Sequence, residues 1–232
     1  MSVLRNDSRV IGCGLGMLAS VLFCFAAATA AADDLDSVDD PLIAAIDAFI
    51  AELDLDKSDK DWKSTVPAPG AKGAFDPEKT YFWNLKTNRG DLKIELFPKS
   101  APLHVLSTIY LTRLGFYDDV KFHRIVIDRV VQGGDPTGTG NGGPGYLYGG
   151  EFDPALSHSK RGIVSMANSG PGTDGSQFFV TCGALALLNG KHTIFGELAV
   201  GKPALSKLCK AGTKRGKPKR KAYIKKATIS VE

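Results

Sequence analysis

The sequence predicts a mainly-β protein whose compact part is a closed antiparallel barrel. Many short runs alternate apolar and polar residues, and the segments that join them are rich in glycine and proline. Few stretches have helical periodicity, and no repeat of 20–50 residues is present. With 232 residues, 26 of them Gly and 12 Pro, the chain is long enough to bury one sizeable core.

Residues 1–32 are predicted to be a signal peptide. Arg5 and Arg9 precede an uncharged apolar run from Val10 to Ala28, and Ala28-Thr29-Ala30 matches an A-x-A cleavage site. The run is also close to the length of a membrane span, so a retained anchor is the alternative. Its glycines and the abrupt change to acidic residues favour cleavage. We therefore expect an exported protein, periplasmic or secreted, with no stable membrane span after cleavage.

Residues 33–75 are predicted to form an acidic N-terminal appendage that contains one helix and a linker. From Asp33 to Asp61 there are eleven acidic residues against two lysines. Asp40 and Pro41 are predicted to be the N-cap and the first turn of the helix. The apolar stripe of this helix is Leu42, Ile46, Phe49, Ile50 and Leu53. The stripe either packs on its own domain or binds a partner, and residues 66–73 are predicted to be a linker.

Residues 76–232 are predicted to be the barrel domain. The first two strands, residues 81–86 and 92–97, are joined by Asn88-Arg89-Gly90, which is typical of a hairpin turn. Ser100 is predicted to cap a helix that runs to Leu114 and ends at Gly115. The remaining predicted strands are 121–126, 129–132, 162–167, 177–182, 193–198 and 222–231, with a second helix over 203–210.

The C-terminal part of the chain is strongly basic. Residues 202–232 hold eleven Lys or Arg and one acidic residue, Glu232. A basic segment can bind nucleic acid, but export argues against that partner, so no nucleic-acid binding is expected. Opposite charge suggests the further hypothesis that this basic segment docks on the acidic appendage.

Two cysteines, Cys182 and Cys209, follow the predicted signal peptide. They form no CxxC motif and have no Cys/His spacing typical of a metal site. A disulfide in an oxidising compartment and two unpaired thiols both remain open.

A glycine-rich stretch between Gly138 and Gly143 fits the G-x-G-x-x-G motif of dinucleotide-binding proteins. That motif needs a helix directly after the glycines, because the pyrophosphate binds at the helix N-terminus. Here Pro144 and further glycines follow, and they cannot start a helix. The stretch is therefore interpreted as a tight loop beside a binding groove, and no cofactor or metal is expected.

Several blocks in one order carry a family resemblance. They are Phe122-His-Arg124, Gln132-Gly-Gly-Asp-Pro136, Ser165-Met-Ala-Asn168, Gly175-Ser-Gln-Phe-Phe179, Gly190-Lys-His192 and Phe195-Gly196. From about Thr80 to the C-terminus the chain resembles the cyclophilins, which are peptidyl-prolyl cis–trans isomerases. The resemblance implies an eight-stranded antiparallel barrel capped by two helices. It also implies that the partners are proline-containing peptides and unfolded or folding exported proteins, bound by a monomer.

The resemblance assigns roles to residues of this chain. Rotating an X–Pro bond needs no covalent step, so a fixed cation that favours the twisted amide is sufficient. Arg124 is the candidate for this cation, and Gln132 would hold the substrate carbonyl or Arg124 itself. The resemblance places the substrate-binding surface at Val130, Ala167, Asn168, Gln177, Phe179, Leu187, Leu188 and His192. Asn168 is expected on an exposed strand edge that pairs with an extended peptide.

Two positions depart from the family. Arg129 stands where many members carry an aromatic residue of the proline pocket, and Leu187 stands where many eukaryotic members carry Trp. These departures motivate an alternative function, a proline-peptide-binding or chaperone-like module with weak or no turnover. A third interpretation, a hydrolase using Ser176 and His192, lacks a nucleophile-elbow motif and an orienting acid.

Overall fold

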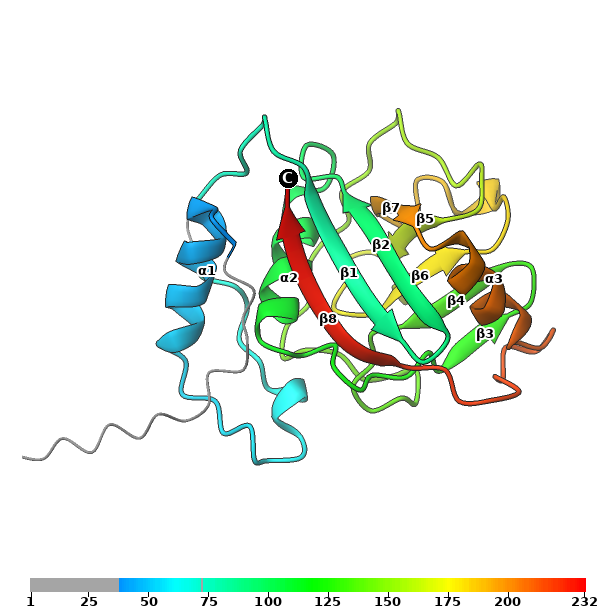
Figure 1. The fold of residues 1–232 in the computed structure, drawn as a ribbon, viewed down its shortest axis with the longest axis horizontal. Helices are drawn as coiled ribbons and strands as arrows, with labels where there is room; N and C mark the ends of the chain where they lie inside the picture. Colours follow the sequence, from blue (N-terminus) through cyan, green and yellow to red (C-terminus); the bar gives the residue numbers. More distant parts are fainter. Residues whose placement is uncertain (1–37, 72) are drawn as a thin grey trace, which may run out of the picture. The chain divides into compact units, whose positions relative to one another are not determined.

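The computed structural model describes residues 38–71 and 73–232, which belong to one compact unit (Figure 1). The predicted signal peptide lies outside the described residues. No helix within the described ranges is long and apolar enough to cross a membrane.

The described chain is built on one eight-stranded antiparallel sheet. Its strands are β1 (Tyr81–Thr87), β2 (Gly90–Leu96), β3 (Arg124–Val126), β4 (Val130–Gly133), β5 (Ile163–Met166), β6 (Phe178–Thr181), β7 (Ile194–Val200) and β8 (Ile224–Val231). Their order across the sheet is β3-β4-β6-β5-β7-β2-β1-β8. The predicted mainly-β, eight-stranded antiparallel fold is therefore confirmed.

The expectation of a fully closed barrel was too strong, because the sheet curls without pairing its two edge strands in a ladder. The edge strand β3 has only three residues. It bonds instead to the loop before β8, where Ile125 N donates to Gly216 O at 2.8 Å and Thr213 N donates to Ile125 O at 3.2 Å. The segments before β3 and β8 meet at one isolated bridge, between Lys121 and Tyr223.

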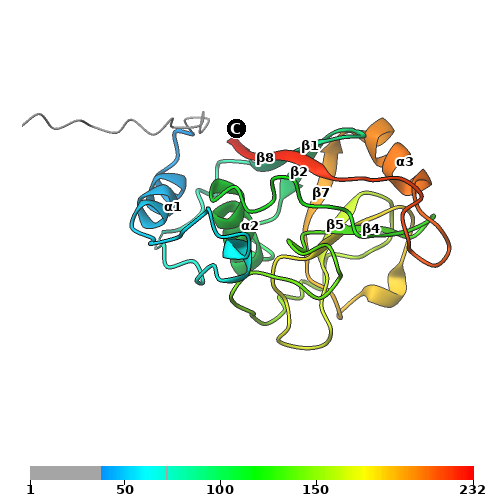
Figure 2. The same ribbon diagram turned by 90° about the horizontal axis from the view of Figure 1, so that it is seen from below.

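Two α-helices, α2 (Pro102–Arg113) and α3 (Lys202–Lys210), pack on the sheet, and two 3-10 turns, η1 (Trp62–Ser64) and η2 (Ala186–Leu188), lie in connecting segments. Figure 2 shows α2 and α3 near opposite ends of the curled sheet. Gly115, with a φ of 77°, comes directly after Leu114, the C-cap of α2, as predicted for a helix terminator.

The predicted cap of α2 was wrong. Ser100 donates its hydroxyl to Asp153 at 2.6 Å, and Ala101 occupies the N-cap position without a side-chain hydrogen bond. The carboxylate of Glu151 accepts from the amides of Leu103 and His104 at 3.2 and 3.1 Å. A carboxylate distant in sequence thus satisfies the free amides of the first turn and complements the helix dipole.

The third α-helix, α1 (Pro41–Ala51), belongs to the appendage. Asp40 caps it as predicted, accepting from the amides of Leu42 and Ile43 at 3.0 and 3.1 Å. Leu42, Ile43 and Ile46 are buried in the same hydrophobic cluster as the barrel core. Of the two alternatives for the apolar stripe, the structure shows packing on its own compact unit, beside α2 (Figure 1).

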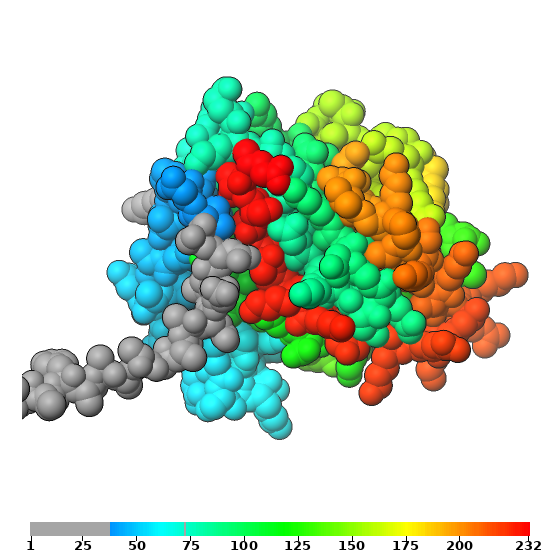
Figure 3. All heavy atoms as spheres, in the orientation of Figure 1, coloured from blue at the N-terminus to red at the C-terminus, as the bar shows by residue number. Residues whose placement is uncertain are grey.

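The hypothesis that the acidic appendage docks on the basic segment was wrong for the part of the appendage that the structure describes. The ion pairs of the described appendage residues connect Asp40 to Lys79 at 3.4 Å and Asp47 to Arg113 at 2.6 Å. Figure 3 shows β8, the red end of the basic segment, beside the appendage helix in blue, and α3, in orange, farther away. The two ion pairs do not reach residues 202–232. The appendage is held instead by apolar burial and by hydrogen bonds to α2 and its following loop.

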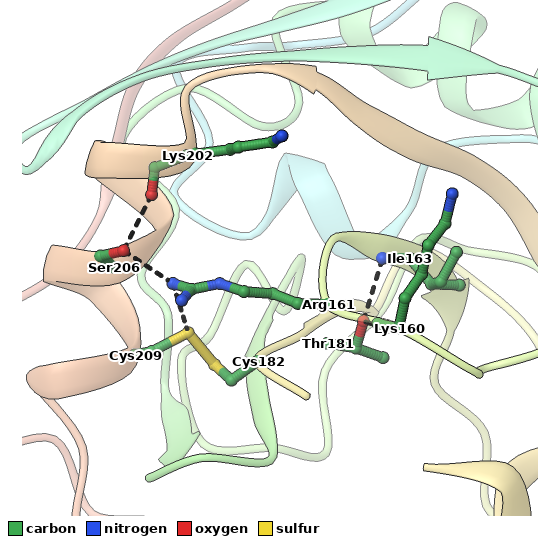
Figure 4. Close-up of a disulfide and its surroundings, with 8 residues drawn as sticks. All are labelled: Lys160, Arg161, Ile163, Thr181, Cys182, Lys202, Ser206 and Cys209. Atoms are coloured by element: carbon green, nitrogen blue, oxygen red, sulfur yellow. Dashed lines mark hydrogen bonds between the residues drawn. A yellow bond between two sulfur atoms is a disulfide. The ribbon is translucent and has the colours of Figure 1, made fainter. Parts of the chain in front are cut away.

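The two cysteines form a disulfide, Cys182–Cys209, with a Cα–Cα distance of 6.0 Å. Figure 4 shows this bond connecting α3 to the residue that follows β6, with the guanidinium of Arg161 donating to Ser206 Oγ at 3.0 Å beside it. Cys182 N also donates to Arg129 O at 2.7 Å. The disulfide and this hydrogen bond together link α3 to the turn before β4.

Candidate active site

The candidate site forms on neighbouring strands β3, β4 and β6 and on the loops at their ends (Figure 1). In the sheet register Arg124 faces Gln132, and Gln132 faces Phe179. Three residues that are far apart in the sequence therefore lie in one row across three strands. In antiparallel sheets, residues directly opposite each other lie close enough for their side chains to interact.

A chain of side-chain hydrogen bonds fixes the guanidinium of Arg124. Arg124 Nη1 donates to Gln132 Oε1 at 3.1 Å, and Gln132 Nε2 donates to Gln177 Oε1 at 3.1 Å. Arg124 is exposed, and its stem passes Gly216, where an added Cβ would lie 3.2 Å from Arg124 Cγ. The guanidinium is thus oriented at the surface, and among the described residues Gln132 accepts from one of its five N–H groups.

The glycine loop is connected to the same hydrogen-bond chain. Gln177 Nε2 donates to the carbonyls of Gly140 and Gly142 at 2.9 and 2.8 Å. The sequence analysis gave Gln177 a groove-lining position but missed this function as a support for the loop. Both glutamines, Gln132 and Gln177, stand in conspicuous sequence blocks. Their contact, however, depends on the pairing of β4 with β6.

Asp135 is a second support of the glycine loop that sequence reasoning missed. Its carboxylate accepts from Thr137 N and Thr137 Oγ1, both at 2.8 Å, and from the amide of Gly140. Burial alone would raise the pKa of Asp135, but these hydrogen bonds outweigh it and hold the pKa below its usual value. The sequence signal was an aspartate directly before Pro136 and five residues before Gly140, where an Asx-type turn is expected.

An apolar cluster, which is the candidate binding pocket, lies next to Gln132, the residue opposite Phe179 in the sheet. Val130, Phe179 and Leu185 are buried in this cluster, and Val126, Ala167 and Leu188 pack against it. The cluster contains four predicted residues: Val130, Ala167, Phe179 and Leu188. Leu185 is an additional member that the sequence analysis missed, because an isolated leucine in a loop gives no periodic signal.

His192 lies against the pocket through its ring. The ring of His192 meets that of Phe179 edge to face at a centroid distance of 5.4 Å. His192 Nδ1 donates to Met166 O at 2.9 Å, which fixes the orientation of the imidazole. This geometry suits packing and not proton transfer. Ser176 is buried and donates to Gly134 O at 2.7 Å, so its hydroxyl is directed away from His192 and the hydrolase interpretation lacks a nucleophile–base contact.

Three predicted positions lie away from the pocket or differ from expectation. Leu187 is 59% exposed and is not part of the apolar cluster, and Arg129 is exposed in the turn before β4. The expectation that Asn168 lies on an exposed strand edge was wrong, because β5 pairs with β6 on one side and β7 on the other. Ala167 and Asn168 follow the end of β5, where Asn168 Nδ2 donates to Lys191 O at 3.1 Å.

The comparisons with known proteins agree with this arrangement. A family model described as "Cyclophilin type peptidyl-prolyl cis-trans isomerase/CLD" matches residues 82–229. Peptidyl-prolyl cis-trans isomerase A of Mycobacterium tuberculosis is 42% identical over 174 residues, which cover 66% of this chain and 94% of that protein. Peptidyl-prolyl cis-trans isomerase CYP18-2 of Arabidopsis thaliana is 47% identical over 128 residues, 53% of this chain and 77% of that protein.

A solved structure is similar over the same region. A cyclophilin type peptidyl-prolyl cis-trans isomerase of Cryptosporidium parvum, crystallised in the presence of the dipeptide Ala-Pro, is 40% identical. The match has a TM-score of 0.62 and covers 64% of this chain and 98% of that one.

Proposed function

Because the chain belongs to the family of cyclophilin-type peptidyl-prolyl cis–trans isomerases, we propose that Arg124 is the residue that catalyses its rotation of X–Pro bonds. The observation that carries this assignment is the hydrogen-bond chain from Arg124 through Gln132 to Gln177. It holds one permanently charged guanidinium in the strand row that also contains Phe179 of the apolar cluster, which is the surface we assign to the proline ring.

The reaction requires only that the site bind the twisted amide better than either planar form. Rotation removes amide resonance and has a barrier of roughly 18–20 kcal/mol in water. In the twisted state the proline nitrogen becomes pyramidal and regains a lone pair, which can accept a hydrogen bond. Arg124 donates to that nitrogen only in the twisted state, and so lowers the barrier without stabilising the ground state.

The pocket of Val130, Phe179, Leu185 and Leu188 holds the proline ring during this rotation. These side chains are apolar and largely buried, and the edge of Phe179 is fixed by His192. When the proline ring is held in place, the residue before the proline is the part that rotates about the X–Pro bond. The similar Cryptosporidium protein was crystallised in the presence of Ala-Pro, which supports proline-containing peptides as the ligand class.

The substrates we propose are exported proteins that fold in an oxidising compartment. The predicted signal peptide over residues 1–32 and the Cys182–Cys209 disulfide both support this location, because disulfides persist mainly outside the cytosol. Export is tested by N-terminal sequencing of the protein recovered from the periplasm and medium of an expressing bacterium. A mature N-terminus close to residue 31 supports export, and an intact Met1 in the cytosol contradicts it.

The assignment of Arg124 is tested with a protease-coupled assay on a short X–Pro peptide. Arg124→Ala should lower kcat/KM about a hundredfold or more, since removing one such electrostatic donor costs roughly 2.7–4 kcal/mol. Arg220→Ala is the matched control, because Arg220 is exposed in the loop before β8 and takes no part in the hydrogen-bond chain. Equal losses in both variants would contradict the assignment.

A further inference from the structure

A groove adjoins the catalytic arrangement on the side of the glycine loop. It encloses about 800 Å³ and is lined by Gln132, Gln177, Asn168, Gly142, Tyr146 and Ser64, among others. Because Gln132 and Gln177 belong both to this groove and to the hydrogen-bond chain of Arg124, a peptide bound at Arg124 enters the groove with its neighbouring residues. Ser64 is the one residue of the N-terminal appendage among the described groove residues.

The appendage reaches this groove through a fixed segment, residues 62–67, which we call the wall segment. Val66 is fully buried in the main hydrophobic cluster, and Pro67 O accepts from Tyr110 Oη of α2 at 3.1 Å. Lys63 Nζ donates to Asp118 O at 2.7 Å. These bonds anchor both ends of the segment on the barrel, so Ser64 is held at the groove by its neighbours.

The contact between the wall segment and the glycine loop requires glycine at position 145. Gly145 N donates to Val66 O at 3.1 Å. A Cβ added at Gly145 would lie 2.5 Å from Val66 O and 3.0 Å from the carbonyl carbon of Thr65. The two backbones therefore touch, which no residue with a side chain would allow without moving one of them.

We propose that the wall segment is part of the substrate-binding surface and that Ser64 limits the size of a substrate side chain flanking the proline. This inference rests on the proposed position of Arg124. An extended peptide advances roughly 3.3 Å per residue, so three residues on either side of Ala-Pro each span roughly 10 Å of the groove. The small hydroxyl at position 64 admits a large apolar or polar side chain of the substrate, and a larger residue at this position would exclude it.

The test measures isomerisation of Ala-Pro peptides by NMR exchange spectroscopy, with Gly or Phe placed at each of the three positions on either side of Ala-Pro. Ser64→Trp should lower the ratio of kcat/KM for Phe over Gly at least threefold at one of these positions. Ser58→Trp is the control, because Ser58 is exposed in the same appendage but outside the groove, and it should leave every ratio unchanged.

A second pair of variants changes the wall without filling the groove. Gly145→Ala should displace the wall segment and alter the same ratio, whereas Gly149→Ala, which meets nothing within 4 Å, should not. The amide resonance of Ser64 should also shift when peptide is added to the wild type. Unchanged ratios in both Ser64→Trp and Gly145→Ala, with melting temperatures kept, would overturn the inference.

The Arg124→Ala and Ser64→Trp variants together distinguish a failure of the wall inference from a failure of the proposed function. If Arg124→Ala retains full activity on every peptide, the proposed catalytic position is wrong. If Arg124→Ala is inactive while Ser64→Trp leaves the ratios unchanged, only the wall inference is wrong.

Discussion

At the scale of single residues, the site works through the support given to one guanidinium. Arg124 is exposed, yet Gln132 and Gln177 orient it through two hydrogen bonds of 3.1 Å. An unsupported arginine would lose rotamer entropy each time it met the twisted amide, which reduces its catalytic effect. Orientation by a second and a third side chain removes much of that cost before the substrate arrives.

Gln177→Ala should therefore lower activity even though Gln177 is not a donor to the rotating bond. The variant loses the acceptor for Gln132 and the donor to the carbonyls of Gly140 and Gly142. A net loss of about 1–1.5 kcal/mol corresponds to a roughly five- to tenfold fall in kcat/KM. The measurement is the protease-coupled assay on wild type and variant, with melting temperatures as the control. Unchanged kcat/KM would show that Arg124 needs no support from the glycine loop.

His104 should give the stability of the protein a distinct pH dependence. Its fully buried ring lies between Asp174 at 2.8 Å and Glu151 at 2.6 Å. Burial alone would lower the pKa of His104, but these two carboxylates outweigh it and raise the pKa above its usual value. A raised pKa stabilises the fold below the unfolded value of about 6.5, and this contribution is lost as the pH rises through the folded value.

The difference in unfolding free energy between wild type and His104→Gln should thus be largest near pH 6 and shrink toward pH 9. Urea unfolding across this range measures it, and subtracting the variant removes the effects of His158 and His123, whose pKa values are lowered by burial. A difference that is constant with pH would mean that folding leaves the pKa of His104 unchanged, and a difference that grows from pH 6 toward pH 9 would mean that His104 is neutral in the folded protein.

The sequence predicts the residues of the candidate site that stand in recognisable blocks. It does not predict the contacts that form between side chains from different segments when the chain folds. Arg124 and Gln132 stand in conspicuous blocks on consecutive strands. The bridge formed by Gln177 and the loop support by Asp135 depend on strand register and backbone geometry, which no local pattern specifies. The contact of Leu185 with Val130 and Phe179 likewise depends on the folded backbone and has no local sequence signal.

At the scale of elements, local signals predicted the strands and the end of α2 but failed at its start. Ser100 has the side chain of a good cap, yet Glu151 supplies two acceptors from another segment and leaves Ser100 to bond Asp153. A carboxylate has the advantage there, because it satisfies two amides and carries the charge that the helix N-terminus favours. Tertiary contacts of this kind override a local cap preference.

The disulfide should stabilise the fold by joining two distant elements. Cys182 and Cys209 are separated by 27 positions, and their bond connects α3 to the residue after β6. Closing a loop of that length in the unfolded chain corresponds to about 3.5 kcal/mol in the chain-entropy model. The double variant Cys182→Ala, Cys209→Ala should show this loss in urea unfolding. Wild type in reducing agent should match the variant, and no difference between oxidised and reduced wild type would contradict the expectation.

At the scale of the whole molecule, the appendage and the barrel share one hydrophobic cluster. Ile46 of α1 is fully buried there, as are Val66 of the wall segment and Ile109 and Tyr110 of α2. The ion pair of Asp47 with Arg113 adds a polar contact between α1 and α2. Since burial in one continuous core couples elements energetically, the appendage should unfold together with the barrel and not before it.

Ile46→Ala tests this coupling. Removing a buried isoleucine down to Cβ costs roughly 2–5 kcal/mol when the surrounding core cannot collapse. If α1 and the barrel form one cooperative unit, the whole loss should appear in the unfolding free energy of the barrel. Urea unfolding can be followed at two points, because Trp62 lies in the wall segment and Trp83 is fully buried in β1.

Single-tryptophan variants, Trp62→Phe and Trp83→Phe, separate the two signals. Within each variant, tryptophan fluorescence and far-UV circular dichroism should report one transition with the same midpoint, and Ile46→Ala should lower the unfolding free energy of both variants equally. Glu52→Ala, at the exposed C-terminal end of α1, is the matched control and should change neither. A transition at Trp62 that precedes an unshifted transition at Trp83 would show an appendage that unfolds by itself. In that case the wall of the substrate groove would open without loss of the barrel, and peptide selectivity would become sensitive to temperature.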